Sequence, residues 1–322
     1  MKAAAVDIGT NSVKMVIGWK DGDAIIVREA VPIITRLGKN TDATGQLDPV
    51  ATERTLAALR HFREQASAEG VSLLRAVGTA ALRDAVNGAE FLNRAEAILG
   101  GPVEVISGDR EAELVYQAAR SDARRLAPEA SVIATTDVGG GSTEVVIGEG
   151  ERPHFRRSLQ IGAVRLTERA LLSDPPSPSD RQAAVDLIEA ILADVPMPFE
   201  PPVLIASGGT AASLGAMHLA EENPDFLRAV GATDFPERLH GVCLTAGEIE
   251  RRIERLCELP LAERRTVPGL EPERADVIIA GALIQWRLLR HLGIDSLFVS
   301  AHGLRYGLLS TLLGDGNGGP TR

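Results

Sequence analysis

The chain has 322 residues, 44% of them hydrophobic, and a formal net charge of −10. This length predicts two domains, and the acidic charge argues against a broad nucleic-acid surface without excluding an anionic substrate in a narrow cleft. No apolar run approaches the roughly 20 residues that span a bilayer, and the N-terminus lacks the features of a signal peptide. Cys243 and Cys257 are the only cysteines, which favours a reducing cytoplasm. From the charge and the absence of a long apolar run, we expect a protein that binds neither nucleic acid nor membrane.

The first half predicts three apolar strands, followed by helices and strands in alternation. The expected elements are strands at about 2–8, 13–19 and 24–33, a helix at 50–69, a strand at 73–78, a helix at 80–99 interrupted near Asn87-Gly88, a strand at 102–106 and a helix at 109–124.

The second half repeats this opening. The expected elements are strands near 131–137, 143–149 and 153–159, a helix from 163, a loop at 174–180 with Ser179 or Asp180 capping the next helix, a strand at 203–206, helices near 210–220, 246–257 and 271–290, a strand at 296–300 and a closing helix. Strand triplets followed by alternating helices and strands predict mixed α/β sheets flanked by helices. We expect domains at 1–126 and 127–322, with the last helix, about 303–315, as a candidate to pack back on the first domain.

One strand–turn–strand pattern occurs twice, 130 residues apart. Residues 7–18 and 137–148 are identical at six positions: Asp7/Asp137, Gly9/Gly139, Ser12/Ser142, Val16/Val146, Ile17/Ile147 and Gly18/Gly148. An Asp at a strand end can hold a hydrated metal ion, and a Gly/Ser/Thr turn offers N–H groups to phosphate oxygens. One such turn alone is an ordinary hairpin about as often as not, but the repetition favours a phosphate held between two turns.

The paired hairpins and the later Ser-Gly-Gly-Thr at 207–210 resemble the actin-like ATPase and sugar kinase superfamily. Within it, the Asp-Val-Gly-Gly-Gly-Ser-Thr-Glu segment at 137–144 is similar to the exopolyphosphatase / guanosine pentaphosphatase phosphohydrolases. Supporting segments are 36–38, 78–83, 106–114, 162–167, 269–277 and 303–307. The resemblance covers essentially the whole chain. It implies two actin-like (ribonuclease H-like) domains with mixed sheets flanked by helices, and an active site in the interdomain cleft.

The resemblance implies that Glu111 is the catalytic base that activates water. Local sequence alone favours an ordinary glutamate at a helix N-terminus. Related proteins often carry a second acid where this chain has Arg110, and Glu113 is the weaker candidate for the base. Glu144 is the second candidate acid, positioning water or metal, while Lys14, its counterpart in the first copy, meets phosphate oxygens. The alternative is that Glu144 and Lys14 are exposed residues on edge strands.

The remaining candidates bind phosphate or metal. Arg83 lies in the active cleft by resemblance, and a guanidinium binds phosphate oxygens bidentately. The turns contribute Gly9, Thr10, Asn11, Ser12, Gly139, Gly140, Gly141, Ser142, Thr143, Gly208 and Gly209. Asp137, with Asp7 and Glu144, is the candidate site for Mg²⁺ or Mn²⁺. Arg36, Lys39, Arg165, Arg274 and Arg305 either line a polyanion path or are surface charges. The histidines show no ligand-like clustering.

Together these features predict a metal-dependent exopolyphosphatase that releases orthophosphate from the end of inorganic polyphosphate. The alternative is a 5′-phosphohydrolase of guanosine pentaphosphate (pppGpp) that uses the same residues. A kinase or ATPase of the same fold, and a non-catalytic sensor of polyphosphate or alarmone, are the less favoured readings. The resemblance also makes a homodimer plausible.

Overall fold

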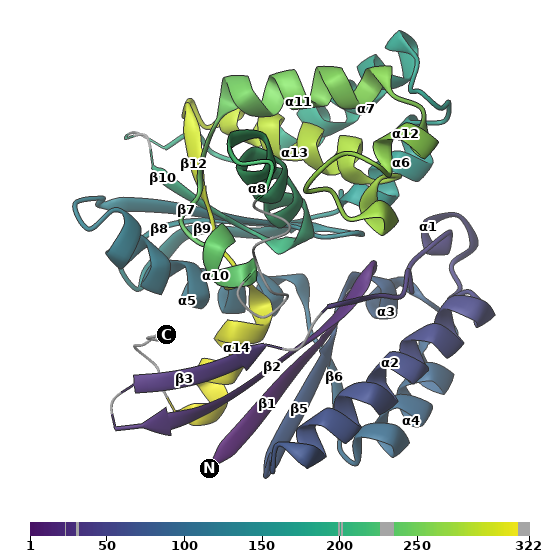
Figure 1. Ribbon diagram of the computed structural model, residues 1–322, viewed down its shortest axis with the longest axis vertical. Coiled ribbons are helices and arrows are strands. Elements are labelled where there is room, and N and C mark those ends of the chain that lie inside the picture. The colour runs from purple at the N-terminus through teal and green to yellow at the C-terminus, as the bar shows by residue number, and fades with distance from the viewer. Residues whose placement is uncertain (23, 30–31, 199, 201, 226–234, 315–322) are drawn as a thin grey trace. The chain divides into compact units, whose positions relative to one another are not determined.

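The structure is a computed structural model that describes residues 1–22, 24–29, 32–198, 200, 202–225 and 235–314, in two compact units (Figure 1). Unit 1 comprises residues 1–121 and the segment that begins at His302, and unit 2 comprises residues 122–301. The division therefore falls once inside a helix and once after the last strand. The domain limits 1–126 and 127–322 stay a prediction.

The sheet of unit 1 combines antiparallel and parallel strands. Its order is β3-β2-β1-β5-β6, with β4 also paired to β2. Strand β1 is antiparallel to β2 and parallel to β5, and β5 is parallel to β6. The strands are β1 (Lys2–Ile8), β2 (Ser12–Asp21), β3 (Ala24–Glu29), β4 (Ile33–Ile34), β5 (Leu73–Gly78) and β6 (Val103–Val105).

Both faces of this sheet are covered by helices, which explains why β1 is an almost continuous apolar run. Ala4, Val6 and Ile8 pack into one core, and Ala3 and Ala5 into another on the opposite face. The helices of unit 1 are α1 (Thr41–Thr44), α2 (Pro49–Ala68), α3 (Ala80–Asp84), α4 (Gly88–Leu99), most of α5 (Gly108–Leu126), and α14 (Leu304–Leu313) (Figure 1).

Helix α14 is an integral part of unit 1 although it comes from the end of the chain. Leu304, Tyr306 and Leu309 share a core with Ala3 and Ala5 of β1. The approach is close on its other side too, because a Cβ added at Gly307 would lie 2.1 Å from the Leu114 carbonyl oxygen of α5. Only glycine allows this backbone-to-backbone packing.

The sheet of unit 2 has the order β11-β12-β10-β7-β8-β9. Its strands are β7 (Val132–Val138), β8 (Thr143–Glu149), β9 (Arg152–Leu159), β10 (Val203–Ser207), β11 (Cys243–Thr245) and β12 (Ser296–Val299). Its helical elements are α6 (Ala163–Ala170), α7 (Pro178–Leu192), α8 (Gly208–Glu222), α10 (Phe235–Leu239), α11 (Ala246–Glu258), α12 (Leu261–Arg264), the short 3-10 helix η1 (Pro272–Arg274) and α13 (Ile278–His291).

The two sheets share one topology. In unit 2, β7 is antiparallel to β8 and parallel to β10, and β10 is parallel to β12. These four strands correspond in order to β1, β2, β5 and β6 of unit 1, which pair in the same directions. The register is also the same, since Asp7 pairs with Lys14 and Asp137 with Glu144. The duplication seen in the sequence is therefore a duplication of structure, and the predicted mixed α/β sheets flanked by helices are confirmed.

Three local predictions differ from the structure. The strand predicted over 24–33 is divided into β3 and β4, which pair with different parts of β2. Helix α7 begins at Pro178, so its N-cap is Ser177 rather than Ser179 or Asp180, and Asp180 is the N3 partner of a capping box. Proline at the first helical position, after a serine, explains this start. The helix predicted over 271–290 is divided into η1 and α13. Among the described residues, no helix combines the length and the apolar character needed to cross a bilayer.

Candidate active site

The first turn, residues 9–12, connects β1 and β2 of unit 1. The Gly9 N–H donates to the Ser12 carbonyl at 3.1 Å, and a Cβ added at Gly9 would lie 3.0 Å from that same oxygen. Thr10, Asn11 and Ser12 are each buried. At the strand ends, Lys14 Nζ lies 3.9 Å from Asp7 Oδ2. The turn thus has a carboxylate and an ammonium group on the paired strands that lead into and out of it.

The predicted base and the predicted phosphate-binding arginine meet in unit 1. Arg83 lies in α3, directly after β5, and Glu111 lies in the first turn of α5. Arg83 Nη1 donates to Glu111 Oε2 at 2.8 Å and to the Ile106 carbonyl at 2.9 Å. Glu111 is 7% exposed, so its charge is held by a specific partner rather than by bulk water.

Arg83 keeps unused hydrogen-bonding capacity. Its Nη2 is buried and has no hydrogen-bond partner within the described part of the chain. A guanidinium has five N–H donors, and a buried donor without an acceptor costs free energy. A phosphate oxygen is a chemically suitable acceptor for it.

Arg110, the residue before the predicted base, does not donate to Glu111 in any of the contacts described for it. It donates to Glu113 at 2.7 Å, and both side chains are partly exposed. Glu113 therefore lies in an ordinary surface ion pair one turn along the helix. The structure separates the two glutamates into different environments, as their spacing on a helix requires.

The second turn, residues 139–142, reproduces the first in unit 2. The Gly139 N–H donates to the Ser142 carbonyl at 3.0 Å. The start of α6 is bonded to it, because Ala163 N donates to Gly139 O at 2.8 Å and Val164 N to Gly140 O at 2.9 Å. A Cβ added at Gly162 would lie 2.5 Å from the Gly140 carbonyl carbon, so this contact also requires glycine.

The two acids beside this turn are oriented by hydroxyl groups. Ser207 Oγ donates to Asp137 Oδ2 at 3.0 Å. Glu144, which is 2% exposed, accepts through Oε1 from Ser142 at 2.9 Å and from Ser158 at 2.7 Å. Glu144 is therefore buried in a hydrogen-bonded setting and is not an exposed residue on an edge strand.

The turn at 207–210 packs directly against Asp137. Gly208 has φ +88°, and a Cβ there would lie 2.2 Å from Asp137 Oδ1. A Cβ at Gly209 would lie 2.0 Å from Arg274 Nη1. Arg274 thus lies against this turn. The sequence allowed two roles for it, a residue of the polyanion path or a surface charge, and its place in the segment 269–277 that carries the family resemblance pointed to it.

Thr143 is placed differently from the other turn residues. Its side chain is fully buried, and its hydroxyl donates to the Ile161 carbonyl at 2.6 Å. This bond fixes the segment that precedes α6. Ser158 could not be selected from the sequence, since a single serine on a strand belongs to no motif.

The acids predicted to hold metal have the chemistry that Mg²⁺ and Mn²⁺ prefer. Asp7, Asp137 and Glu144 offer only carboxylate oxygens, which are hard ligands. Asp137 and Glu144 are register partners on adjacent antiparallel strands, which places their side chains on one face of the sheet. Ser207 orients Oδ2 of Asp137, and Gly208, which has no side chain, lies beside Oδ1. These carboxylates fit Mg²⁺ or Mn²⁺ as ligands.

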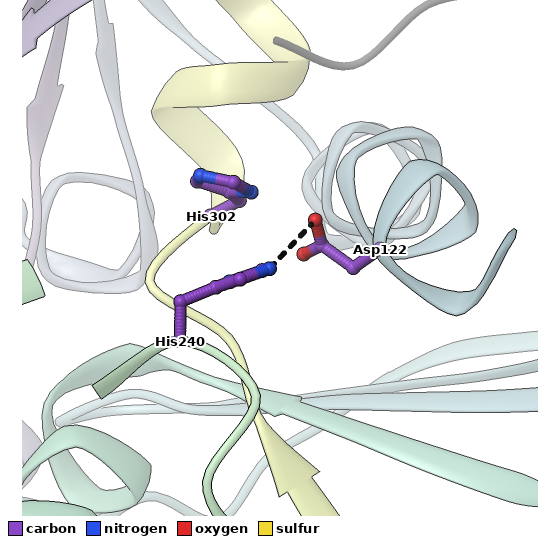
Figure 2. A group of neighbouring side chains, drawn as sticks. All are labelled: Asp122, His240 and His302. Carbon is purple, nitrogen blue, oxygen red and sulfur yellow. Dashed lines mark ion pairs between the residues drawn. The ribbon is translucent and has the colours of Figure 1, made fainter. Parts of the chain in front are cut away.

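A separate polar group lies in unit 2. Asp122 Oδ2 accepts from Ser300 Oγ at 2.5 Å, and its Oδ1 lies 3.6 Å from His240 Nε2 (Figure 2, which also draws His302). The prediction that the histidines show no ligand-like clustering is wrong here, because His240 lies beside the Asp122 carboxylate. This pair went unseen because Asp122 and His240 are 118 residues apart in the chain.

Comparison with known proteins agrees with this geometry. The sequence profile of the Ppx/GppA phosphatase family matches residues 6–315. The chain belongs to the Ppx/GppA phosphatase family. The match includes both turns, Arg83, Glu111 and α14.

Relatives of this Ppx/GppA phosphatase align over nearly their whole length. A protein named exopolyphosphatase 2 of Mycobacterium tuberculosis is 33% identical over 97% of this chain and 99% of the relative. The structure of a Ppx/GppA family member from Aquifex aeolicus is 32% identical, with a TM-score of 0.78, over 98% of this chain and 99% of that chain. An exopolyphosphatase structure from Cytophaga hutchinsonii has a TM-score of 0.86 at 26% identity, over 98% of both chains. These neighbours confirm the actin-like fold.

Proposed function

We propose that this protein is an exopolyphosphatase, which hydrolyses the terminal phosphoanhydride of inorganic polyphosphate and releases orthophosphate. The observation that carries the proposal is the buried Glu111 carboxylate held by Arg83 at 2.8 Å, in a family whose relatives bear the name exopolyphosphatase at 33% identity. A buried acid paired with an arginine that keeps an unpartnered N–H group combines a proton acceptor with a phosphate ligand.

Glu111 acts as the general base. Its bond to Arg83 orients the carboxylate, which can accept the proton of a water molecule aligned behind the terminal phosphorus. The water oxygen then bonds to phosphorus as the bridging P–O bond breaks, which yields orthophosphate and a chain shorter by one phosphate. Glu144 supports this step by orienting water or metal beside the second turn.

The phosphate oxygens are held by backbone and side-chain donors. The turns offer donor groups from Thr10, Asn11 and Ser12 in unit 1 and from Gly140, Gly141 and Ser142 in unit 2, and Gly208 and Gly209 allow close approach. Gly9 and Gly139 close the two turns through their own N–H groups. The predicted role of Thr143 as a phosphate donor is not retained, because its hydroxyl donates to the Ile161 carbonyl. Arg83 and Lys14 offset the phosphate charge. Preorganised donors of this kind supply most of the rate gain in phosphoryl transfer.

Asp137 and Glu144 are the proposed ligands for Mg²⁺ or Mn²⁺ in unit 2, and Asp7 offers a further carboxylate in unit 1. A divalent ion held by these carboxylates would supply positive charge to offset negative charge on phosphate oxygens. Ser207 and Ser158 keep the carboxylates pointed for that role through the bonds described above.

The test is orthophosphate release from polyphosphate and from pppGpp, in parallel, with Mg²⁺ and without any acceptor. An exopolyphosphatase releases phosphate from polyphosphate, and the release stops on addition of a chelator. Faster turnover of pppGpp assigns the chain to the pentaphosphate hydrolases instead. Turnover only with an added acceptor indicates a kinase, and binding without turnover indicates a sensor.

We further propose that the protein works in the cytoplasm and forms a homodimer. Both cysteines are free thiols, one of them exposed, which suits a reducing compartment. The homodimer rests on family resemblance alone, and sedimentation equilibrium measures it directly.

A further inference from the structure

Arg36 has a backbone conformation that its side chain disfavours. Its φ is +55°, and Asn40 is the only other non-glycine residue with positive φ in the described ranges. In the left-handed region the Cβ of an L-residue crowds the following carbonyl, a cost that glycine avoids and asparagine largely escapes.

Asn40 is an internal comparison for Arg36. Asn40 has φ +59° at the N-terminus of α1, and asparagine is a residue type that tolerates this geometry. Four residues earlier the same geometry is adopted by an arginine. Strain of this kind is retained where the side chain has a function.

The position of Arg36 is set by hydrogen bonds to the first turn. The N–H groups of Thr35 and Arg36 both donate to the Asn11 carbonyl, at 3.0 and 2.9 Å, and Gly38 N donates to the Thr10 carbonyl at 2.9 Å. The backbone of Arg36 is therefore one hydrogen bond away from the turn that we propose binds phosphate.

The same segment packs against the helix that carries Arg83. A Cβ added at Gly38 would lie 2.3 Å from Thr10 Cγ2 and 3.1 Å from the Cβ of Ala81 in α3. Thr35 and Leu37, on either side of Arg36, are 1% and 0% exposed, whereas Arg36 is half-buried. The two neighbours anchor the loop, and the left-handed residue between them is only partly buried.

We propose that Arg36 is a substrate-binding residue whose guanidinium binds phosphate oxygens beside the turn 9–12, as a cation separate from Arg83. This role rests on the proposed function. It explains why a strained arginine is kept where asparagine would satisfy the backbone, because only the cation binds the phosphate.

The test compares Arg36→Asn, Arg36→Lys and the control Arg54→Gln, which removes one exposed positive charge from α2. The affinity for tripolyphosphate is measured by calorimetry and the unfolding temperature by circular dichroism. We expect Arg36→Asn to bind about 10-fold more weakly or worse, while its unfolding temperature rises by about 2 °C as strain is relieved. Arg36→Lys should bind with intermediate affinity and gain no stability, and Arg54→Gln should match the wild type in both measurements.

Three results overturn the proposal. Arg36→Asn with wild-type affinity removes the phosphate contact. Weaker binding together with a lower unfolding temperature makes Arg36 a structural residue, and an equal loss in Arg54→Gln makes the effect one of general charge. If the wild type neither binds nor hydrolyses polyphosphate, the proposed function fails first and Arg36 fails with it; if only the Arg36 variants behave unexpectedly, the function stands.

Discussion

At the scale of single residues, the account depends on Glu111 as the base. We predict that Glu111→Gln, which keeps the shape and removes the charge, lowers kcat roughly 100-fold or more while tripolyphosphate affinity is retained. Glu113→Gln, on the same helix, is the matched control, because Glu113 lies in an exposed pair with Arg110. Steady-state phosphate release measures both, and near-normal turnover of Glu111→Gln would exclude Glu111 as the base.

Arg83 has two functions in the account, and substitutions separate them. It holds Glu111 and the Ile106 carbonyl through Nη1, and it keeps Nη2 for phosphate. We predict that Arg83→Ala lowers kcat/KM about 100-fold even at saturating metal. Arg83→Lys should recover only part of this loss, because an ammonium lacks the planar fork. An unchanged kcat/KM in Arg83→Ala would exclude Arg83 as a phosphate-binding residue.

At the scale of single elements, the close packing of the 207–210 turn on Asp137 predicts a sensitive glycine. Gly208→Ala places a Cβ 2.2 Å from Asp137 Oδ1 at φ +88°, and we expect a loss of roughly 2 kcal/mol in unfolding free energy. Gly101→Ala is the control, since a Cβ there meets no heavy atom within 4 Å. Urea denaturation of both variants checks the prediction; equal stability would contradict the packing.

Helix α11 makes a prediction about pH. Burial by itself raises the pKa of Glu248, but hydrogen bonds from Thr245 and the charges of His218 and Arg252 outweigh it, and the pKa is lowered. Since the folded pKa is below the unfolded one, this carboxylate stabilises α11 at pH values above about 4.5. The stabilisation is lost as pH falls through the folded pKa.

We therefore expect Glu248→Gln to be less stable than the wild type at pH 7, by about 1 kcal/mol or less, and the difference to vanish in acid. Glu250→Gln, exposed on the same helix, should show no such trend. Denaturant unfolding at a series of pH values tests this. A difference that grows toward low pH would contradict the sign of the pKa change.

Elements with long apolar patterns could be predicted from the sequence, and short ones could not. The strand triplets and α2 emerge from period and repetition, because many residues contribute to each pattern. Helix α1 and strand β11 have four and three residues, too few to show a period. The start of α7 depends on Ser177 and Asp180 bonding to each other's backbone, a reciprocal contact that several nearby polar residues could have made.

The candidate site was predictable as a set of residues but not as a set of contacts. Repetition and motif selected Asp137, Glu144, Arg83 and Glu111. The pairing of Arg83 with Glu111, 28 residues apart, is fixed by the order of β5, α3 and α5 in the fold. Ser158, which orients Glu144, has no local signal at all.

At the scale of the whole molecule, the same strand order and the same hairpin register occur in both units. The two copies differ where function is expected, with Lys14 opposite Asp7 and Glu144 opposite Asp137. One architecture thus carries a carboxylate opposite an ammonium group in one unit and two carboxylates opposite each other in the other. We infer that this division lets one half of the chain favour phosphate and the other favour metal.

The most direct measurement of the central claim is hydrolysis of polyphosphate in ¹⁸O-labelled water with Mg²⁺ and no acceptor, for the wild type and Glu111→Gln. The account predicts that each orthophosphate released by the wild type carries one labelled oxygen, and that release by Glu111→Gln is slower by roughly 100-fold or more. Unlabelled product, no release without an acceptor, or equal rates in the two proteins would contradict it.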